Sequence, residues 1–132
     1  KESTDKLKDA IIFLGTIPNF DMPNYIEKAN LCCYPSHMEA MPLAWLEVLA
    51  MGKTFVGSTT GPGSEAVAHN QTGLLADPFN PEDIAEKIRY VFENKEKAIQ
   101  LGVNAREKII KDFDVDVMVE KNISFFKSLI AK

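Results

Sequence analysis

The sequence predicts an α/β fold in which a parallel β-sheet carries helices on both faces. Four short, mostly apolar runs occur along the chain, and segments with helical spacing or helix-capping residues separate them. A run that is apolar throughout is typical of a strand covered on both faces, and such strands form parallel sheets. The 132 residues suffice for one domain with a core, and the hydrophobic fraction of 45% is ordinary for a globular protein. The runs are residues 11–14, 31–34, 54–57 and 74–76.

The first expected strand, residues 11–14, contains β-branched residues and is closed by Gly15. We expect it to be buried in the sheet. A helix is predicted next, because Asp21 is a residue type that caps helix N-termini and Pro23 suits a first turn. This helix should run to about residue 28.

Cys32 and Cys33 are the only cysteines, and they are adjacent in the second expected strand. Neighbouring side chains on a strand point to opposite faces of the sheet. A disulfide between them would be strained, and two neighbouring thiols do not make a zinc site. We therefore expect two reduced thiols that act as small core residues, which indicates a cytosolic setting.

Residues 36–60 are expected to organise the domain as a loop, a buried helix and a buried strand. Pro42 fits the first helical position, and Gly52 fits the left-handed position beyond the helix end. Between them, every residue from 43 to 51 is apolar except Glu47. A helix that is apolar all round belongs in a core, where an unpartnered carboxylate costs several kcal/mol. Glu47 is therefore expected to face a polar cleft.

Glu39 and Glu47 should flank the N-terminus of this helix, since Glu39 lies in the loop that feeds it. The free backbone N–H groups of Leu43 and Ala44 favour an anion such as phosphate. Amide donors for phosphate beside carboxylate acceptors for hydroxyls suit a nucleotide or a nucleotide sugar. In the alternative interpretation, Glu47 reaches back to its own helix end and Glu39 is a solvated loop residue.

The loops that follow the expected strands meet at one edge of the sheet, because parallel strands all end there. They include residues 35–39 and 58–63, and the second loop is rich in small residues that let a backbone approach a ligand. Ligands of open α/β sheets bind at this edge, which favours a functional role for Glu39 and Glu47. His37 is interpreted as a loop residue without a special role, with a phosphate or sugar contact as the alternative.

Three helices are predicted to close the chain. Asn80 should cap the first, with Pro81 at its opening position. The second should cover residues 95–111, and the third should be capped by Asp114 and run to the C-terminus. The aspartates around this last cap form D-x-D patterns, which hold a divalent metal in some enzymes. Here they suit a helix N-terminus, so we expect no metal.

Composition and spacing argue against several other classes of protein. The net charge is −4 and there is no basic block, which argues against a nucleic-acid partner. No apolar run approaches the length of a membrane span, and no signal peptide is recognisable. Ser, His and Asp residues are not spaced as a hydrolase triad.

Several motifs follow one another in a defined order. They are Glu39 and Glu47 in E-x7-E spacing, L-E-V-L-A-M-G at 46–52, G-P-G-S-E at 61–65, and G-L-L-A-D-P at 73–78 followed by P-E-D-I-A-E-K-I. Together they resemble the C-terminal domain of retaining glycosyltransferases with the GT-B fold, the group that includes glycogen and sucrose synthases. The resemblance extends from about residue 11 to the C-terminus. It implies a Rossmann-like domain that holds a nucleotide-sugar donor, with the active site in the cleft to a second domain.

The resemblance also assigns roles to individual residues. Glu39 resembles the first motif glutamate, which lies near the donor sugar and is the candidate catalytic residue. Glu47 resembles the second glutamate, which accepts hydrogen bonds from the ribose hydroxyls. Backbone contacts to the sugar and phosphates are implied for Met41, Pro42 and Leu43.

Thr16 and Ile17 resemble the loop that contacts the base of the nucleotide. The implied partners are a nucleotide sugar and a saccharide or lipid-linked acceptor, with no cofactor and no metal. Residues 40–42 read Ala-Met-Pro, where the family often has a Gly-Phe-Gly-like run, so the sugar pocket should differ in shape.

The family clamps the donor diphosphate with an Arg and a Lys that would precede residue 1, as would its acceptor domain. We therefore expect residues 1–132 to be a single partial domain, truncated at its N-terminal side, that binds donor weakly and transfers nothing alone. In the strand order 3-2-1-4-5-6, residues 11–14 would pair with a strand outside this sequence. They should then move to an available edge, or the chain should form a homodimer through an exposed strand edge.

For the intact enzyme we expect sugar transfer in the synthesis of a cell-surface or capsular polysaccharide. The expected location is cytoplasmic, with peripheral contact to the inner membrane face as an alternative. Two other functions stay open. One is a non-catalytic nucleotide- or protein-binding module, and the other is a sugar-nucleotide epimerase of similar fold, whose catalytic acids and histidine we cannot place.

Overall fold

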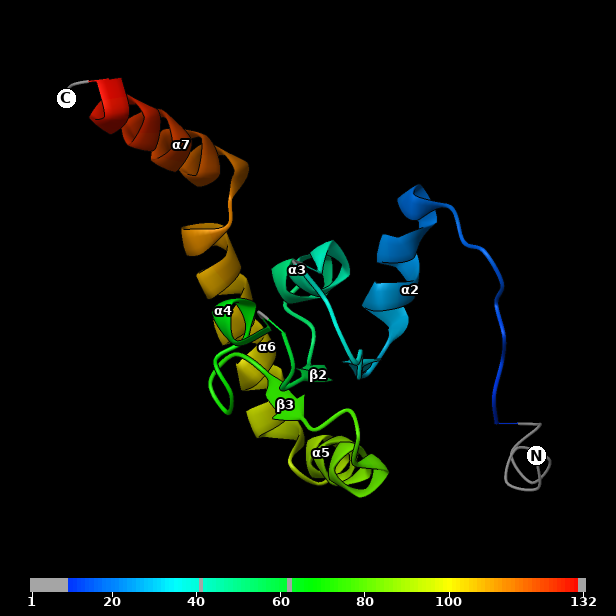
Figure 1. The fold of residues 1–132 in the computed structure, drawn as a ribbon. Coiled ribbons are helices and arrows are strands. Elements are labelled where there is room, and N and C mark those ends of the chain that lie inside the picture. Colours follow the sequence, from blue (N-terminus) through cyan, green and yellow to red (C-terminus); the bar gives the residue numbers. More distant parts are fainter. Residues whose placement is uncertain (1–9, 41, 62, 131–132) are drawn as a thin grey trace.

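The computed structural model describes residues 10–40, 42–61 and 63–130, which fold into a small parallel sheet flanked by helices (Figure 1). In chain order the elements are η1 (Asn19–Asp21), α2 (Met22–Lys28), β1 (Cys32–Tyr34), α3 (Leu43–Ala50), β2 (Phe55–Ser58), α4 (Gly63–Ala66), β3 (Leu74–Ala76), α5 (Pro81–Glu93), α6 (Lys95–Asp112) and α7 (Val115–Ile130). The strands lie in the order β1-β2-β3, with β2 in the middle.

Both strand pairs are parallel, as the sequence predicts. Cys32 of β1 pairs with Phe55 of β2, and Val56 of β2 pairs with Leu74 of β3. Because parallel strands run in one direction, the loops after β1, β2 and β3 all leave the same edge of the sheet.

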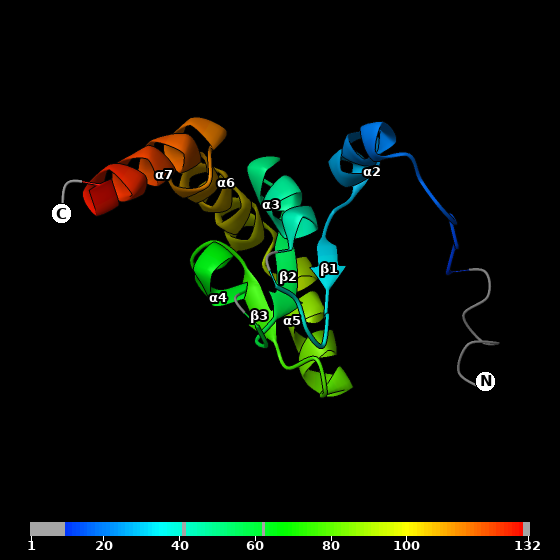
Figure 2. The ribbon, with the colours of Figure 1, turned by 45° about the horizontal axis from the view of Figure 1, so that its top comes forward.

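Neighbouring residues of β2 face two different cores. Phe55 packs with Trp45 of α3 on one side of the sheet, where the two ring centroids are 5.0 Å apart. Val56 packs with Val91 of α5 in the other core. Full burial of a large side chain such as Phe55 stabilises the fold by about 1.5–3 kcal/mol. The prediction of helices on both faces is confirmed (Figure 2).

The two cysteines lie on opposite faces of β1, as predicted. Cys32 packs against the core that contains Phe55, and Cys33 packs against the core that contains Val56. Both thiols are free and half-buried, and burial raises the pKa of each. They therefore act as small core groups with little thiolate character.

Helix α6 is anchored to the segment that joins α3 to β2. The buried Thr54 hydroxyl donates a hydrogen bond to the Ala98 carbonyl oxygen over 3.0 Å. One turn further along α6, Gly102 approaches Gly52 so closely that a Cβ on Gly102 would overlap the Gly52 carbonyl oxygen. These contacts hold α6 against the segment between α3 and β2.

Residues 11–14 do not form the buried strand that their sequence predicts. Within the described residues they pair with no strand, and Ile12 and Phe13 are 81% and 87% exposed. They also do not join the outer edge of β1. An apolar run becomes a strand only where a neighbour takes up its backbone hydrogen bonds, and no neighbour lies beside this run in the part of the chain that the structure describes.

Helix α2 lies where it is predicted, but Asp21 does not cap it through its side chain. Asp21 is the last residue of η1, its N–H donates to the Pro18 carbonyl oxygen over 2.9 Å, and its backbone is helical with φ −90° and ψ −18°. A capping side chain needs an extended backbone at that position, so the prediction of this cap is wrong.

Two predicted helix caps are confirmed in the C-terminal half. The Asn80 side chain accepts hydrogen bonds from the N–H groups of Glu82 and Asp83 over 3.1 and 3.3 Å. Asp114 Oδ1 accepts one from the Asp116 N–H over 3.0 Å at the start of α7.

Helix α7 extends away from the rest of the molecule (Figure 1) and contains no buried residue. Its apolar side chains are therefore largely exposed, including Phe125 and Phe126 at 58% each. None of the described helices combines the length and the hydropathy that crossing a bilayer requires.

Candidate functional site

The N-terminus of α3 is open in this structure. Pro42 occupies the N-cap, one position before the predicted one, and within the described residues no side chain caps the helix. The Pro42 carbonyl oxygen accepts from the Trp45 N–H over 2.9 Å, so the N–H groups of Leu43 and Ala44 precede the first intrahelical bond. Both residues are exposed, Leu43 at 68%. At the other end Gly52 has φ +68°, which confirms the predicted left-handed stop.

The prediction that this helix is buried all round is wrong. Trp45 and Val48 are buried, whereas Glu47 lies on an exposed face together with Leu43 and Ala44. These three positions are spaced three and four residues apart, so they share one side of the helix. Exposure explains why the carboxylate is tolerated there, and no burial cost has to be offset.

The Glu47 side chain borders a cavity of about 270 Å³ between α3 and the η1–α2 segment. The other residues that line it are Asn19, Met22, Pro23, Ile26 and Met51. Tyr34 lies near this carboxylate: burial raises the pKa of Tyr34 most, and the charges of Cys32 and Glu47 raise it further. Asn19 was missed by the sequence analysis, because only folding brings η1 to α3.

The loop that carries Glu39 is held by the loop after β2. Thr60 Oγ1 donates to the carbonyl oxygens of His37 and Ser36 over 2.9 and 3.2 Å. Since that hydroxyl proton is used, the 2.7 Å contact between Ser58 Oγ and Thr60 Oγ1 has Ser58 as the donor. These hydrogen bonds hold the backbone of the loop after β1 against the loop after β2.

Gly61 completes this contact between the two loops. Its φ is +73°, and a Cβ at this position would lie only 2.9 Å from the Glu39 carbonyl oxygen. The Glu39 side chain is half-buried. The contacts therefore place Glu39 against the β2 loop, whereas Glu47 faces the η1–α2 segment.

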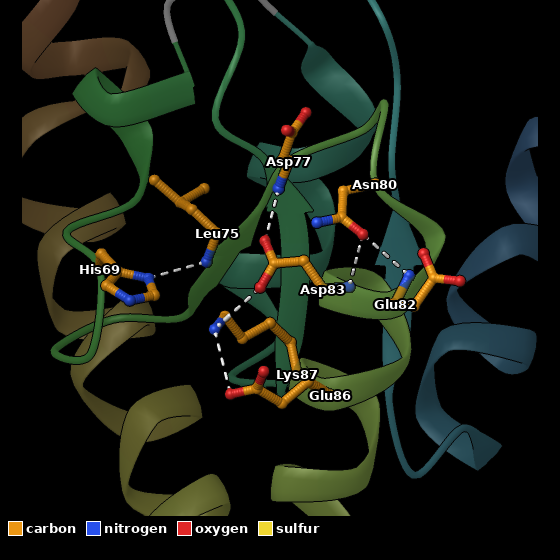
Figure 3. A network of polar contacts seen from close by, with 8 residues as sticks. All are labelled: His69, Leu75, Asp77, Asn80, Glu82, Asp83, Glu86 and Lys87. Atoms are coloured by element: carbon orange, nitrogen blue, oxygen red, sulfur yellow. Dashed lines mark hydrogen bonds and ion pairs between the residues drawn. The ribbon is translucent and has the colours of Figure 1, made fainter.

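The third loop, after β3, is ordered by a network of polar contacts (Figure 3). Asp83 Oδ2 accepts from the Asp77 N–H over 2.8 Å, and Asp83 forms an ion pair with Lys87 at 3.0 Å. The Asp77 N–H, and after it Lys87, lowers the pKa of Asp83 below its usual range. On β3 itself, the Leu75 N–H donates to His69 Nδ1 over 2.9 Å, which fixes the tautomer of His69 with the proton on Nε2.

The first and third loops are joined by two stacked rings. The ring centroids of His37 and Phe79 are 4.6 Å apart, and the planes are inclined by 20°. The sequence alone predicts neither this contact nor a role for Phe79, and it favours His37 as a loop residue without a special role over a phosphate or sugar contact. The signal was present, since Phe79 is a large apolar residue within the turn sequence D-P-F-N-P.

The other predicted site residues are Thr16, Ile17, Met41 and Pro42. Thr16 is exposed and Ile17 half-buried, in the segment that leads to Asn19. Pro42 is buried, so only its backbone is available at the helix end. Met41 lies outside the described residues. Neither Thr16 nor Ile17 lines the Glu47 cavity, and in the described residues neither forms a hydrogen bond with Glu39 or Glu47.

The aspartates of the D-x-D pattern serve helix ends. Asp112 Oδ2 lies 2.8 Å from Lys108 Nζ, and this contact lowers the pKa of Asp112. Asp114 caps α7, as described above. Within the described residues, no three His, Cys, Asp or Glu side chains are grouped so that they could hold a metal ion.

Comparison with known proteins identifies the family. The profile described as "Glycosyl transferases group 1" matches residues 3–108, so the chain belongs to this family. A glycogen synthase of Mycobacterium tuberculosis is 30% identical over 102 residues, which are 77% of this chain and 25% of that protein. The chain thus spans about a quarter of the length of that relative.

Solved structures share the fold over nearly the whole chain. The sucrose-phosphate synthase of Thermosynechococcus elongatus matches with a TM-score of 0.87 and 27% identity, over 98% of this chain and 32% of that one. HepE of Anabaena, solved in complex with UDP, matches with a TM-score of 0.88 and 24% identity, over 96% and 34% of the two chains. The Rossmann-like α/β fold class that the sequence predicts is therefore confirmed.

Proposed function

We propose that this chain is the donor-binding domain of a retaining glycosyltransferase of the E-x7-E type that acts without a metal. The observation that carries the proposal is the first turn of α3, which no side chain of the described residues caps. This turn follows the loop that carries Glu39 and leaves the carboxyl edge of the parallel sheet after β1, and it precedes Glu47. Ligands of open α/β folds bind outside this edge, and an open helix N-terminus favours a phosphate.

In this proposal the Glu47 carboxylate accepts hydrogen bonds from the ribose hydroxyls. Its exposure and the adjoining cavity of about 270 Å³ support the role, since a carboxylate facing an open cavity is free to accept. Thr16 and Ile17 contact the base, and Asn19 adds an amide beside it.

The diphosphate would bind at the N–H groups of Leu43 and Ala44. The helix N-terminus carries roughly half a positive charge, which stabilises the negative charge that develops on the leaving diphosphate. The backbone of Met41, Pro42 and Leu43 meets the phosphates and the sugar, and Glu39 lies at the donor sugar.

Two nucleotides, UDP and GDP, are candidates for the carrier of the donor sugar. HepE was solved with UDP, and a relative from M. tuberculosis that is 22% identical is named as a GDP-mannose-dependent mannosyltransferase. We propose a saccharide or lipid-linked acceptor, a role in polysaccharide synthesis and action in the cytoplasm, with residues 1–132 forming the donor-binding half of a two-domain enzyme.

The test is Glu47→Gln in the enzyme that contains this chain, assayed with UDP-glucose and GDP-mannose. Loss of hydrogen bonds to a charged acceptor should raise the donor KM by about tenfold to a hundredfold. Glu107→Gln, an exposed carboxylate on α6, is the matched control and should change nothing. A Glu47→Gln enzyme with an unaltered donor KM would contradict the proposal, and a change in stability alone would indicate a non-catalytic scaffold.

The isolated chain allows a second measurement. We expect it to bind either nucleotide sugar weakly in isothermal titration, because it spans about a quarter of the length of the glycogen synthase that it matches and the proposed donor site lies in a cleft between two domains. Submicromolar binding would contradict this expectation.

A further inference from the structure

The indole ring of Trp45 joins the first turn of α3 to both ends of the loop after β2. Trp45 is 1% exposed, and its backbone N–H donates to the Pro42 carbonyl oxygen in that turn. A Cβ on Gly57 of β2 would lie 2.9 Å from Cη2 of the indole, and a Cβ on Gly63 would lie 2.5 Å from its Cζ3. The outer edge of the indole therefore fills the space that these two glycines leave free.

The segment between the two glycines holds the backbone of Glu39. Within it, Thr60 Oγ1 donates to the carbonyl oxygen of His37 over 2.9 Å. Gly61, in the same segment, lies so close to Glu39 that an added Cβ would be 2.9 Å from the Glu39 carbonyl oxygen. Since the indole packs against both ends of this segment, the position of Glu39 relative to α3 depends on Trp45.

Packing in the core does not by itself account for an indole at this position. Trp45 Nε1 is buried and has no hydrogen-bond partner among the described residues, and a buried donor without an acceptor lowers stability. A phenyl ring could also pack against Phe55, whose ring centroid is 5.0 Å from that of Trp45, and would bury no such donor. A phenyl ring would not reach the two glycines, because Cζ3 and Cη2 belong to the outer edge of the larger indole.

We propose that Trp45 is a positioning residue for the reaction, an inference that rests on the donor site proposed above. It sets the distance between Glu39, at the donor sugar, and the N–H groups in the first turn of α3, at the diphosphate. Glu47 lies on another face of α3, and the cavity beside it is not lined by Trp45. Loss of the indole edge should therefore slow the reaction without weakening the hold on the nucleoside.

The experiment measures hydrolysis of UDP-glucose and GDP-mannose, which needs no acceptor, by the enzyme that contains this chain. Trp45→Phe removes the outer edge of the indole and should lower kcat about tenfold to a hundredfold with an unaltered donor KM, since displacement of a reacting group by about 1 Å has an effect of this size. Gly63→Ala should lower kcat in the same way. Gly63 does not have a positive φ, so its backbone accepts an alanine, and only the contact with the indole is disturbed.

The double variant Trp45→Phe/Gly63→Ala tests whether this contact is the cause. Its added methyl group occupies the space that the indole edge has left, so it should regain most of the kcat that either single variant loses. Val91→Ala is the matched control, because Val91 is 4% exposed in the core on the other face of the sheet. It should lower stability and leave kcat and the donor KM unchanged, which is also the pattern that a merely structural Trp45 would give.

Each of the other kinetic outcomes overturns the proposal. A wild-type kcat for folded Trp45→Phe would show that Glu39 does not depend on the indole, and a raised donor KM would place the defect at the nucleoside. A double variant slower than both single variants would exclude the contact with Gly63 as the cause. If Trp45→Phe does not fold, Gly63→Ala decides, and a wild-type kcat for that variant overturns the proposal.

A second measurement separates the positioning from the proposed function. If the wild type hydrolyses neither donor, the proposed function fails, and the role of Trp45 is judged by amide NMR relaxation of this chain. The order parameters of the Glu39 and Gly61 amides should fall in Trp45→Phe and recover in the double variant. Order parameters that do not change would overturn the positioning role.

Discussion

A methyl group added to Gly61 tests whether the loop after β2 holds the Glu39 backbone in place. Gly61 has φ +73°, and the new Cβ would lie 2.9 Å from the Glu39 carbonyl oxygen. A left-handed backbone costs an alanine about 1–2 kcal/mol, and overpacking against a backbone atom costs about 1–3 kcal/mol more. Gly61→Ala should therefore lower the free energy of unfolding by about 2–5 kcal/mol.

Gly52→Ala is the matched control for this prediction. Gly52 has nearly the same φ, +68°, but its nearest neighbour would be 3.6 Å from the added Cβ, an ordinary van der Waals contact. Only the backbone cost remains, about 1–2 kcal/mol. The assay is urea unfolding followed by the fluorescence of Trp45, the single tryptophan. Equal losses for the two variants would refute the claim that the Glu39 backbone is packed against Gly61.

The remaining predictions concern the anchoring of α6 and the polar network after β3. Gly102→Ala should lower the thermal midpoint by the equivalent of about 1–3 kcal/mol, because the added Cβ would overlap the Gly52 carbonyl oxygen. Elsewhere in a helix the change from glycine to alanine is normally stabilising. A raised midpoint would show that the two segments can separate freely. Thr54→Val should cost about 1–2 kcal/mol in urea unfolding through its lost bond to Ala98, and a neutral substitution would argue against that bond. The pKa of Asp83 is lowered in the folded state, so its stabilisation is present above the ordinary value of 3.8 and is lost as the pH falls through the lowered value. The stability difference between wild type and Asp83→Asn should therefore be largest at neutral pH and shrink in acid, and a difference independent of pH would contradict this.

Features that depend on adjacent residues could be predicted from the sequence. Asn80 caps α5 because the N–H groups that its side chain accepts from lie only two and three residues further along the chain. Gly52 ends α3 because the left-handed backbone that stops the helix depends on that residue alone. The parallel strand pairs could also be predicted, because a short, continuously apolar run between helices is typical of a strand that is covered on both faces in a parallel sheet.

Features that depend on distant neighbours could not be predicted in this way. The apolar run of α3 does not reveal that Leu43 is exposed, because that depends on how much of the helix its neighbours cover, and so the prediction of a helix buried on all sides was wrong. Residues 11–14 carry a strand signal, but a strand also requires a partner. The contact between His37 and Phe79 joins two separate loops, and only the folded sheet brings them together.

Helix α7 has a consequence for how the molecule opens in solution. Its sixteen residues bury no side chain, and Lys121 Nζ, which donates to the Asp112 carbonyl oxygen over 3.2 Å, ties it to the end of α6. Unwinding it exposes little new surface, so it can melt while β2 stays folded. Amide hydrogens of α7 should therefore exchange with deuterium early, at a rate that hardly changes with denaturant concentration. The helix would thus open separately from the sheet.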